Sequence, residues 1–348
     1  MKQKREVKVG SVVIGGAAAI SVQSMTNTKT DDVKATLNQI NDLYQAGADL
    51  VRVSVPDEKS LSALWEIVKN SPFPVIADTH YSLDFAIKCV EAGAKKVRVN
   101  PGNTKNTGRL DDLVKTCLER GAAIRIGVNS GSLGDEYKDL PKHEALAKCA
   151  YDYEKKFYDA GFLDTVLSVK SSDVLTTVRA NRMLWEICQS PLHIGLTEAG
   201  TYENGVIKST AALSALLLDG IGNTVRVSLT TPNLTDEIRV ARKLLAFLGL
   251  RNDVVDVVAC PTCARTEIDV AALAEQIERA TFGIKKSIKI AVMGCAVNGI
   301  GECGDADLGV CGGKQKSLII SRGNILETVQ NSDLLPVLMR RVKELIKE

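Results

Sequence analysis

The stretch Leu50-Val51-Arg52-Val53-Ser54-Val55 is a short β-branched run in which an arginine and a serine stand between valines. Successive side chains of a strand point to opposite faces, so Arg52 and Ser54 share one face and the valines share the other. The same context, an arginine flanked by Val or Ile on both sides, returns at Arg98, Arg125 and Arg226. The repetition indicates one strand-based unit that is used several times along the chain.

Short apolar runs alternate with longer amphipathic segments over the first two-thirds of the chain, which predicts alternating strands and helices. The predicted strands cover residues 20–25, 50–55, 74–80, 96–101, 123–129, 165–171, 192–198 and 224–229. Helices are expected between them, for example over residues 31–46 and 83–92. Glycines occupy the positions where left-handed helix caps are needed, at Gly47, Gly93, Gly121, Gly161, Gly220 and Gly249.

Eight βα units predict a (β/α)8 TIM barrel, an α/β fold, over residues 1–252. A doubly wound open sheet is the alternative. It would usually carry fewer units and a glycine-rich phosphate loop, and no such loop follows any of these strands.

Composition limits the class of protein. The 348 residues suffice for about two domains, and 45% hydrophobic with 25% charged residues is typical of a globular chain. The sequence has no apolar run of about 18 residues, so no membrane span is expected, and Gly15-Gly16 interrupts the one stretch that imitates a signal peptide. A net charge of +2 and 4% aromatic residues argue against nucleic-acid binding. Nine cysteines are too few for a secreted disulfide scaffold, so we expect a cytoplasmic protein.

The carboxyl ends of the predicted strands carry many cations, and active sites of TIM barrels lie at these ends. The cations are Arg52, Arg98, Arg125, Lys170 and Arg226. Burying each one unpaired would cost several kcal/mol, and the strands offer only Asp78 and Glu198 as carboxylate partners. Either the cations are structural and paired, or the missing negative charge arrives with the substrate. The shortage of carboxylates favours a phosphorylated di-anion, and the charge count fits a diphosphate better than a monophosphate.

Residues 253–348 predict a second, smaller α/β domain. Strands are expected over residues 254–259 and 288–293, helices over 267–280 and 333–347, and one more strand region before the last helix. Cys260-Pro261-Thr262-Cys263 follows the first strand, and Gly294-Cys295 follows the second. A zinc ribbon would need a second C-x-x-C motif, and a thioredoxin-like dithiol normally opens a helix near the start of its domain. Three cysteines behind two strands favour an iron–sulfur cluster.

The other cysteines divide by context. Cys89, Cys117, Cys149 and Cys188 fall in predicted helices and are expected to be small buried hydrophobes. Cys303 and Cys311 are left unassigned.

Over nearly its whole length the sequence resembles the bacterial 4-hydroxy-3-methylbut-2-enyl diphosphate synthases of the non-mevalonate isoprenoid pathway. The motifs that carry the resemblance are Val22-Gln23-Ser24-Met25-Thr26, Val51-Arg52-Val53-Ser54-Val55-Pro56, Asn100-Pro101-Gly102-Asn103, Arg125-Ile126-Gly127-Val128-Asn129, Thr197-Glu198-Ala199-Gly200, Arg226-Val227-Ser228-Leu229, Cys260-Pro261-Thr262-Cys263 and Met293-Gly294-Cys295. The resemblance implies a TIM barrel followed by a small α/β domain that holds a [4Fe–4S] cluster. It implies an iron–sulfur oxidoreductase that converts 2-C-methyl-D-erythritol 2,4-cyclodiphosphate to 4-hydroxy-3-methylbut-2-enyl diphosphate by two-electron reductive ring opening with loss of water.

The resemblance also assigns residues. The cluster ligands carry over to Cys260, Cys263, Cys295 and Glu302, and the substrate-binding residues carry over to Arg52, Arg98, Arg125, Asn129, Lys170 and Ser228, with Arg226 as an addition from the same strand. Two departures stand out: Ile300 replaces the family's proline, and Cys303 beside Glu302 makes a four-thiolate cluster conceivable. For proton transfer, Glu198 is the first candidate, followed by Asp78 and His80.

The resemblance further implies a ferredoxin or flavodoxin as electron donor, and a head-to-tail homodimer in which each cluster domain caps the partner's barrel. The short link at residues 250–254 agrees with that arrangement, because the eighth helix ends at the face opposite the active site. Two rivals remain: a barrel enzyme for phosphorylated sugars with structural zinc on the cysteines, and a non-catalytic pterin- or corrinoid-binding barrel.

Overall fold

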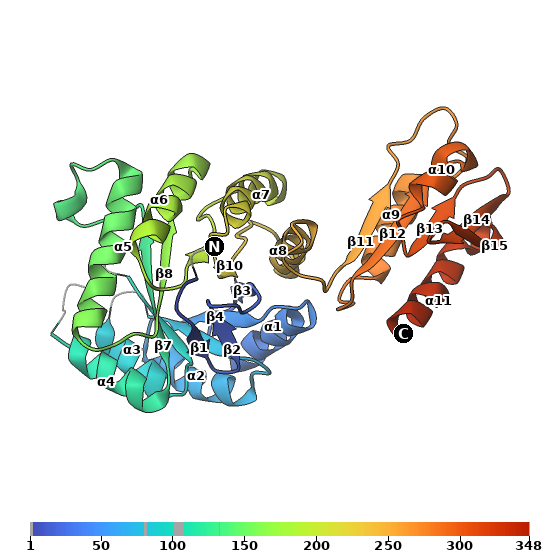
Figure 1. The fold of residues 1–348 in the computed structure, drawn as a ribbon. Helices are drawn as coiled ribbons and strands as arrows, with labels where there is room; N and C mark the ends of the chain where they lie inside the picture. The colour runs from blue at the N-terminus through green and yellow to red at the C-terminus, as the bar shows by residue number, and fades with distance from the viewer. Residues whose placement is uncertain (1–2, 80–81, 101–107, 132, 348) are drawn as a thin grey trace. The chain divides into compact units, whose positions relative to one another are not determined.

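The computed structural model describes residues 3–79, 82–100, 108–131 and 133–347. The chain divides into two compact units, Met1–Leu250 and Arg251–Glu348 (Figure 1), and each has its own hydrophobic core. Within the described ranges no helix is long and apolar enough to cross a bilayer.

The first unit is an eight-stranded parallel barrel surrounded by helices, as the sequence predicts. Its strands are β3 (Ser21–Met25), β4 (Leu50–Ser54), β5 (Val75–Asp78), β6 (Lys96–Val99), β7 (Ala123–Asn129), β8 (Thr165–Lys170), β9 (His193–Ile194) and β10 (Thr224–Val225). They are hydrogen-bonded in the order β8-β7-β6-β5-β4-β3-β10-β9. The amide of Leu167 in β8 donates to the carbonyl of Pro191 before β9 (3.0 Å), which joins the two ends of the sheet.

Helices follow the strands and cover the outside of the barrel (Figure 1). They are α1 (Val33–Gln45), α2 (Glu58–Asn70), α3 (Leu83–Glu91), α4 (Leu110–Arg120), α5 (Lys142–Asp159), α6 (Val174–Ile187), α7 (Tyr202–Leu218) and α8 (Thr235–Phe247). Valines such as Val51 and Val53 are fully buried in the core between strands and helices, so the arginines beside them face the barrel interior. The six glycines predicted to cap helices all have positive φ.

The last two barrel strands are shorter than predicted. The sequence predicts strands over residues 192–198 and 224–229, but only His193–Ile194 and Thr224–Val225 form the ladder. After β9 the backbone leaves the extended conformation, with φ of 52° at Glu198 and 113° at Gly200.

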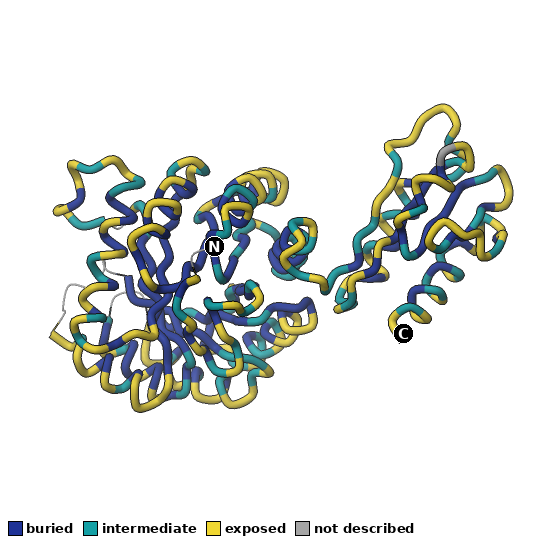
Figure 2. Tube along the Cα trace, viewed as in Figure 1, coloured by how far each residue is buried: buried dark blue, intermediate teal, exposed yellow. Residues whose placement is uncertain are grey.

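An amino-terminal hairpin closes one end of the barrel. Strands β1 (Val7–Val9) and β2 (Val12–Ile14) pair in antiparallel fashion. Val7, Val9 and Ile14 are fully buried against residues near the starts of the barrel strands, namely Leu50, Ile76, Ala123 and Val166. Figure 2 shows the buried interior that results. The apolar stretch that imitates a signal peptide in the sequence therefore supplies part of this hairpin.

The second unit is a five-stranded mixed sheet with helices on both faces. Its elements are β11 (Val255–Ala259), α9 (Val270–Ala280), β12 (Ile288–Met293), α10 (Ala296–Glu302), β13 (Leu308–Cys311), β14 (Lys316–Ser321), β15 (Asn324–Gln330) and α11 (Leu334–Lys347). The strands lie in the order β11 to β15, parallel from β11 to β13 and antiparallel beyond. Helices α9 and α11 pack on one face, and α10 packs on the other. The sequence predicts one strand region between Cys311 and the last helix, where the structure has two strands, β14 and β15, and it does not predict β13.

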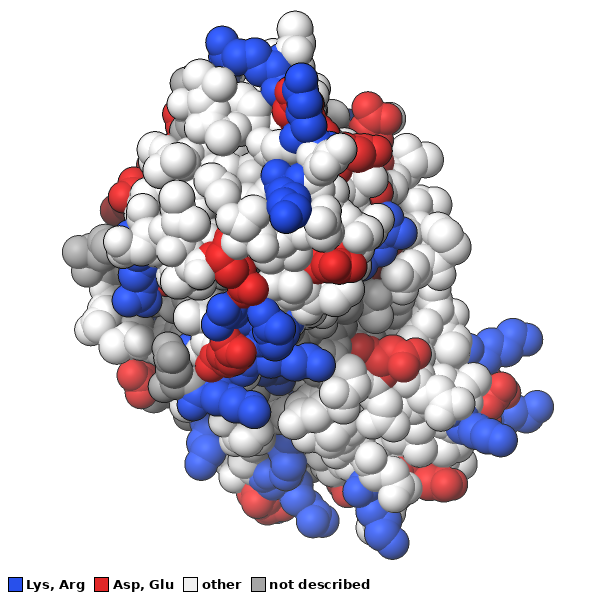
Figure 3. All heavy atoms as spheres, turned by 90° about the vertical axis from the view of Figure 1, so that its right-hand side faces the viewer, with Lys and Arg blue, Asp and Glu red and all other residues white. Residues whose placement is uncertain are grey.

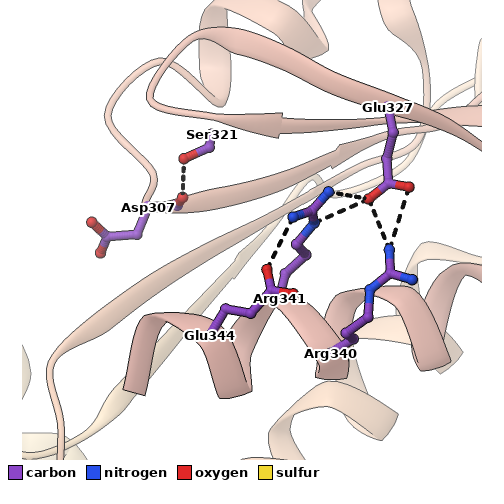
Figure 4. Close-up of polar contacts among 6 residues, drawn as sticks. All are labelled: Asp307, Ser321, Glu327, Arg340, Arg341 and Glu344. Atoms are coloured by element: carbon purple, nitrogen blue, oxygen red, sulfur yellow. Dashed lines mark hydrogen bonds and ion pairs between the residues drawn. The ribbon is translucent and has the colours of Figure 1, made fainter. Parts of the chain in front are cut away.

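An ion-pair network ties β15 to α11. Glu327 accepts hydrogen bonds from Arg341 (2.7 Å) and Arg340 (3.1 Å), as Figure 4 shows. The hydrogen bond from Arg341 is the main cause that lowers the pKa of Glu327. This carboxylate therefore stabilises the fold above its unfolded pKa, and that contribution is lost as the pH falls through the folded value.

Figure 3 shows Lys and Arg side chains gathered among acidic ones on the face that it displays.

Candidate active site

Cationic side chains from several strands converge on one pocket inside the barrel. Its lining residues are Arg52, Arg98, Arg125, Gly127, Asn129, Ser168, Lys170, Leu196, Thr197 and Arg226. All five cations that the sequence predicts are therefore brought together, and they come from β4, β6, β7 and β8 and from the segment that follows β10. Guanidinium and ammonium groups gathered in one pocket have the chemistry to bind a multiply charged anion.

One buried carboxylate bridges two of the arginines. Asp78 lies 3.4 Å from Arg52 Nη1 and 3.2 Å from Arg98 Nη1, and its side chain is only 3% exposed. Burial lowers the pKa of Arg52 to about 9, while the negative charge of Asp78 opposes that shift. Arg52 thus stays charged at neutral pH. The structural alternative, pairing with interior carboxylates, applies to this part of the cluster.

Arg125 is in a different situation. Its Nε and Nη1 atoms, and Nε of Arg226, are buried without a hydrogen-bond partner among the described residues. Burial and the neighbouring Arg52 and Arg98 lower the pKa of Arg125 well below its ordinary value. Unsatisfied buried donors are costly, so these groups are poised to bind anionic oxygens.

Three further ionisable side chains of this interior were missed in the sequence. Lys96 lies two residues before Arg98 on the same strand face and is fully buried. His193 begins β9, and Glu237 reaches in from α8 to accept from the amide of Leu229 (2.9 Å). Because side chains alternate between the two faces of a strand, Lys96 and His193 could have been predicted to face the barrel interior. Nothing in the local sequence pattern predicts that Glu237 does so.

Other predicted site residues lie elsewhere. Glu198 is exposed beyond β9, and Ser228 is half-buried beyond β10; neither lines the described pocket. His80 and the motif residues 101–103 fall outside the described part of the chain.

The cysteine motifs meet at a second pocket, of about 430 Å³, in the smaller unit. Cys260 and Cys263 follow β11, Cys295 follows β12, and Glu302 is the last residue of α10; all four line this pocket. The amide of Gly294 donates to Cys260 Sγ (3.3 Å). These thiols are half-buried or exposed, as ligands open to a bound group should be.

The donor set fits a polynuclear cluster. Three cysteines and one carboxylate line a single pocket, and in a cluster each thiolate binds a different metal atom. Cys260, Cys263, Cys295 and Glu302 are the residues that could hold it.

The remaining cysteines are buried and do not line this pocket, although Cys260 packs against the hydrophobic cluster that contains Cys303 and Cys311. Cys303 and Cys311 face each other between α10 and the sheet, with their sulfurs 3.7 Å apart. Burial raises the pKa of each of the other four thiols to about 12, which agrees with the packing role predicted for them; these are Cys89, Cys117, Cys149 and Cys188. Cys188 lies just after α6 and not within it.

Comparison with known proteins covers both units. The model of the GcpE TIM-barrel domain matches residues 4–242, and that of the GcpE protein C-terminal domain matches residues 256–344. The chain is 44% identical to the 4-hydroxy-3-methylbut-2-en-1-yl diphosphate synthase (flavodoxin) of Aquifex aeolicus, over 100% of this chain and 98% of the relative. It is 45% identical to the protein of the same name from Caldanaerobacter subterraneus subsp. tengcongensis, with the same coverage.

Solved structures show similarity of fold. The dihydropteroate synthase of Yersinia pestis superposes with a TM-score of 0.51 at 12% identity, over 70% of this chain and 98% of that chain. At that identity the match supports the barrel alone. The two family models and the full-length relatives go further, and the chain belongs to the GcpE family, whose relatives named above are 4-hydroxy-3-methylbut-2-en-1-yl diphosphate synthases.

Proposed function

We propose that the chain catalyses the reductive ring opening and dehydration of 2-C-methyl-D-erythritol 2,4-cyclodiphosphate to 4-hydroxy-3-methylbut-2-enyl diphosphate. Two electrons and two protons enter, a carbon–oxygen bond of the ring breaks, and one oxygen leaves as water. The proposal rests on one observation: the chain has both a cationic pocket in the barrel and a cysteine pocket in the second unit. Its full-length relatives are named 4-hydroxy-3-methylbut-2-en-1-yl diphosphate synthase (flavodoxin). We place the reaction in the cytoplasm, where thiols stay reduced.

The barrel pocket is the proposed diphosphate site. Arg52, Arg98, Arg125, Asn129, Lys170 and Arg226 would bind phosphate oxygens, and Ser228 is added from the family resemblance. The unpartnered donors of Arg125 and Arg226 support this role. Fixed cations there also stabilise the negative charge that develops on the leaving phosphate oxygen as the ring opens.

The cysteine pocket is the proposed [4Fe–4S] site, with Cys260, Cys263, Cys295 and Glu302 as ligands. A bound cluster of this type supplies one-electron transfer to the substrate. Two features support Glu302 over Cys303 as fourth ligand: Glu302 lines the pocket, whereas Cys303 is fully buried against Cys311.

Anaerobic turnover tests the proposed function. The purified protein should be brown, contain iron and sulfide, and convert the cyclodiphosphate with a reduced one-electron donor. Its visible absorbance should fall on exposure to air. A colourless zinc-loaded protein, or an iron-loaded protein without turnover, would contradict the proposal.

Glu198 is the proposed proton donor to the leaving hydroxyl. Its φ of 52° is unusual for a residue other than glycine, and such backbone strain clusters at functional sites. Glu198→Gln should lower kcat by about 10²- to 10⁴-fold with little change in KM. Glu203→Gln, an exposed carboxylate of α7, is the matched control. Full turnover by the Glu198 variant would transfer the role to Asp78 or His80, although the two ion pairs of Asp78 support a counter-ion role for it.

The proposed partners are an electron donor and a second copy of the chain. The relatives' names specify flavodoxin, which we prefer to ferredoxin. In the proposed head-to-tail homodimer, each cluster domain serves the partner's barrel. Mixing an Arg125→Met variant with a Cys263→Ser variant should then restore activity, because each mixed dimer contains one intact composite site. Inactivity after verified subunit exchange, or a fully active monomer, would refute this arrangement.

A further inference from the structure

The ammonium of Lys170 lies against His193 of β9 and beside Gly195, the residue that follows β9. His193 Nε2 lies 3.1 Å from Lys170 Nζ, and both residues are buried, with His193 fully so. Gly195 is the first residue after β9, and a Cβ placed on it would clash with the carbonyl oxygen of Arg226 and lie 3.1 Å from that Nζ. His193 therefore contacts the ammonium, and the missing side chain at Gly195 leaves space beside it.

The charges around this contact determine whether Lys170 or His193 donates the hydrogen bond. An ammonium has three donors and no acceptor, whereas a neutral imidazole offers one acceptor nitrogen. Burial, followed by the charge of Lys170, lowers the pKa of His193 well below its ordinary value, which keeps the imidazole neutral. The charged groups of the surrounding elements are Arg52 on β4, Asp78 on β5, Lys96 and Arg98 on β6, Arg125 on β7, Arg226 after β10 and Glu237 on α8. Burial, followed by the charges of Arg226 and Arg125, lowers the pKa of Lys170 well below its ordinary value. An anion bound in the pocket opposes that shift and favours the charged form of Lys170.

We propose that His193 is a positioning residue for substrate binding: its Nε2 accepts a hydrogen bond from the Lys170 ammonium and so directs the other two N–H donors into the anion pocket. This role requires the imidazole proton on Nδ1. Gly195 contributes by having no side chain, since a Cβ there would clash with the carbonyl oxygen of Arg226 and crowd the ammonium. The inference rests on the proposed function, in which Lys170 binds the diphosphate.

Two substitutions at His193 separate this role from packing. His193→Leu keeps the approximate volume but removes the acceptor, and should raise KM for the cyclodiphosphate by about 10- to 100-fold, as loss of a hydrogen bond to a charged group would. Its kcat should change much less. His193→Gln restores an acceptor and should recover most of the affinity. Thr224→Val is the matched control, because Thr224 pairs with His193 in register and is equally buried, but its hydroxyl makes no hydrogen bond to Lys170 in the described structure.

A double-mutant cycle tests whether His193 acts through Lys170. In a Lys170→Met background, His193→Leu should add no further increase in KM. Calorimetric titration of the holoenzyme with inorganic diphosphate should show the same pattern of affinities. The titration measures binding without turnover, so it still tests the role of His193 if the proposed reaction is not observed.

Equal impairment by His193→Leu and His193→Gln in folded protein would overturn the inference. Unchanged affinity in His193→Leu would overturn it as well, as would additive effects in the cycle. If His193→Leu does not fold, His193→Gln against the Thr224→Val control decides: parental affinity in both supports the inference, and weaker binding in His193→Gln alone overturns it.

Discussion

Replacing Asp78 with asparagine is expected to lower the free energy of unfolding of the barrel by about 3–5 kcal/mol, which is the cost of removing one partner from a buried ion pair. Asp78 contacts both Arg52 and Arg98 at 3.2–3.4 Å in an interior where cations outnumber carboxylates. Asparagine keeps the shape of the side chain but leaves two buried guanidinium groups without their counter-charge. Denaturant unfolding of the barrel measures the loss.

A bound anion should compensate for that substitution. Inorganic diphosphate places negative charge beside the same arginines, so it should raise the melting temperature of Asp78→Asn by more than that of the parent protein. Asp84→Asn is the matched control: Asp84 pairs with Arg109 at 3.2 Å, but both side chains are about half exposed, so little change is expected. Parental stability in Asp78→Asn, with no additional stabilisation by diphosphate, would show that Asp78 is not the counter-ion of this pocket.

The sequence predicts the barrel well because its signal is local. Each strand is a β-branched run, and alternation places Arg52, Arg98 and Arg125 on the inner face. Lys96 and His193 obey the same rule, so their burial in the interior could have been predicted from their strands. Glu237 could not, because only tertiary packing brings α8 close to the end of β10.

Two other differences have physical causes. Residues 12–14 pair with 7–9 across a turn at Gly10, whose φ is 60°, and the hairpin is stabilised by burial against the barrel and not by a distinctive local pattern. The hairpin of β14 and β15 turns at Arg322-Gly323, where both residues have positive φ. Arginine is uncommon in that conformation, so the turn is poorly marked in the sequence.

Glu302 and Cys303 are adjacent, and the sequence alone does not decide which of them is the fourth cluster ligand. Helix geometry distinguishes the two. Neighbours on a helix point about 100° apart, so one can face a pocket while the other packs on the sheet. Here Glu302 lines the cysteine pocket, and Cys303, which caps α10, lies against Cys311 and Ala306.

Glu302→Ala is therefore expected to reduce iron retention and turnover by about 10- to 100-fold or more. Removal of a residue that only supports a metal ligand already has an effect of this size. Cys303→Ser should leave iron, sulfide and the visible spectrum unchanged, because its sulfur faces the sheet. Cys311→Ser serves as the control for disturbing the buried thiol pair. Iron and sulfide analysis of anaerobically purified variants, together with turnover, provides the measurement. An intact and active Glu302→Ala enzyme beside an iron-free Cys303→Ser enzyme would reverse the assignment, and it would mean that α10 must rotate when the cluster is bound.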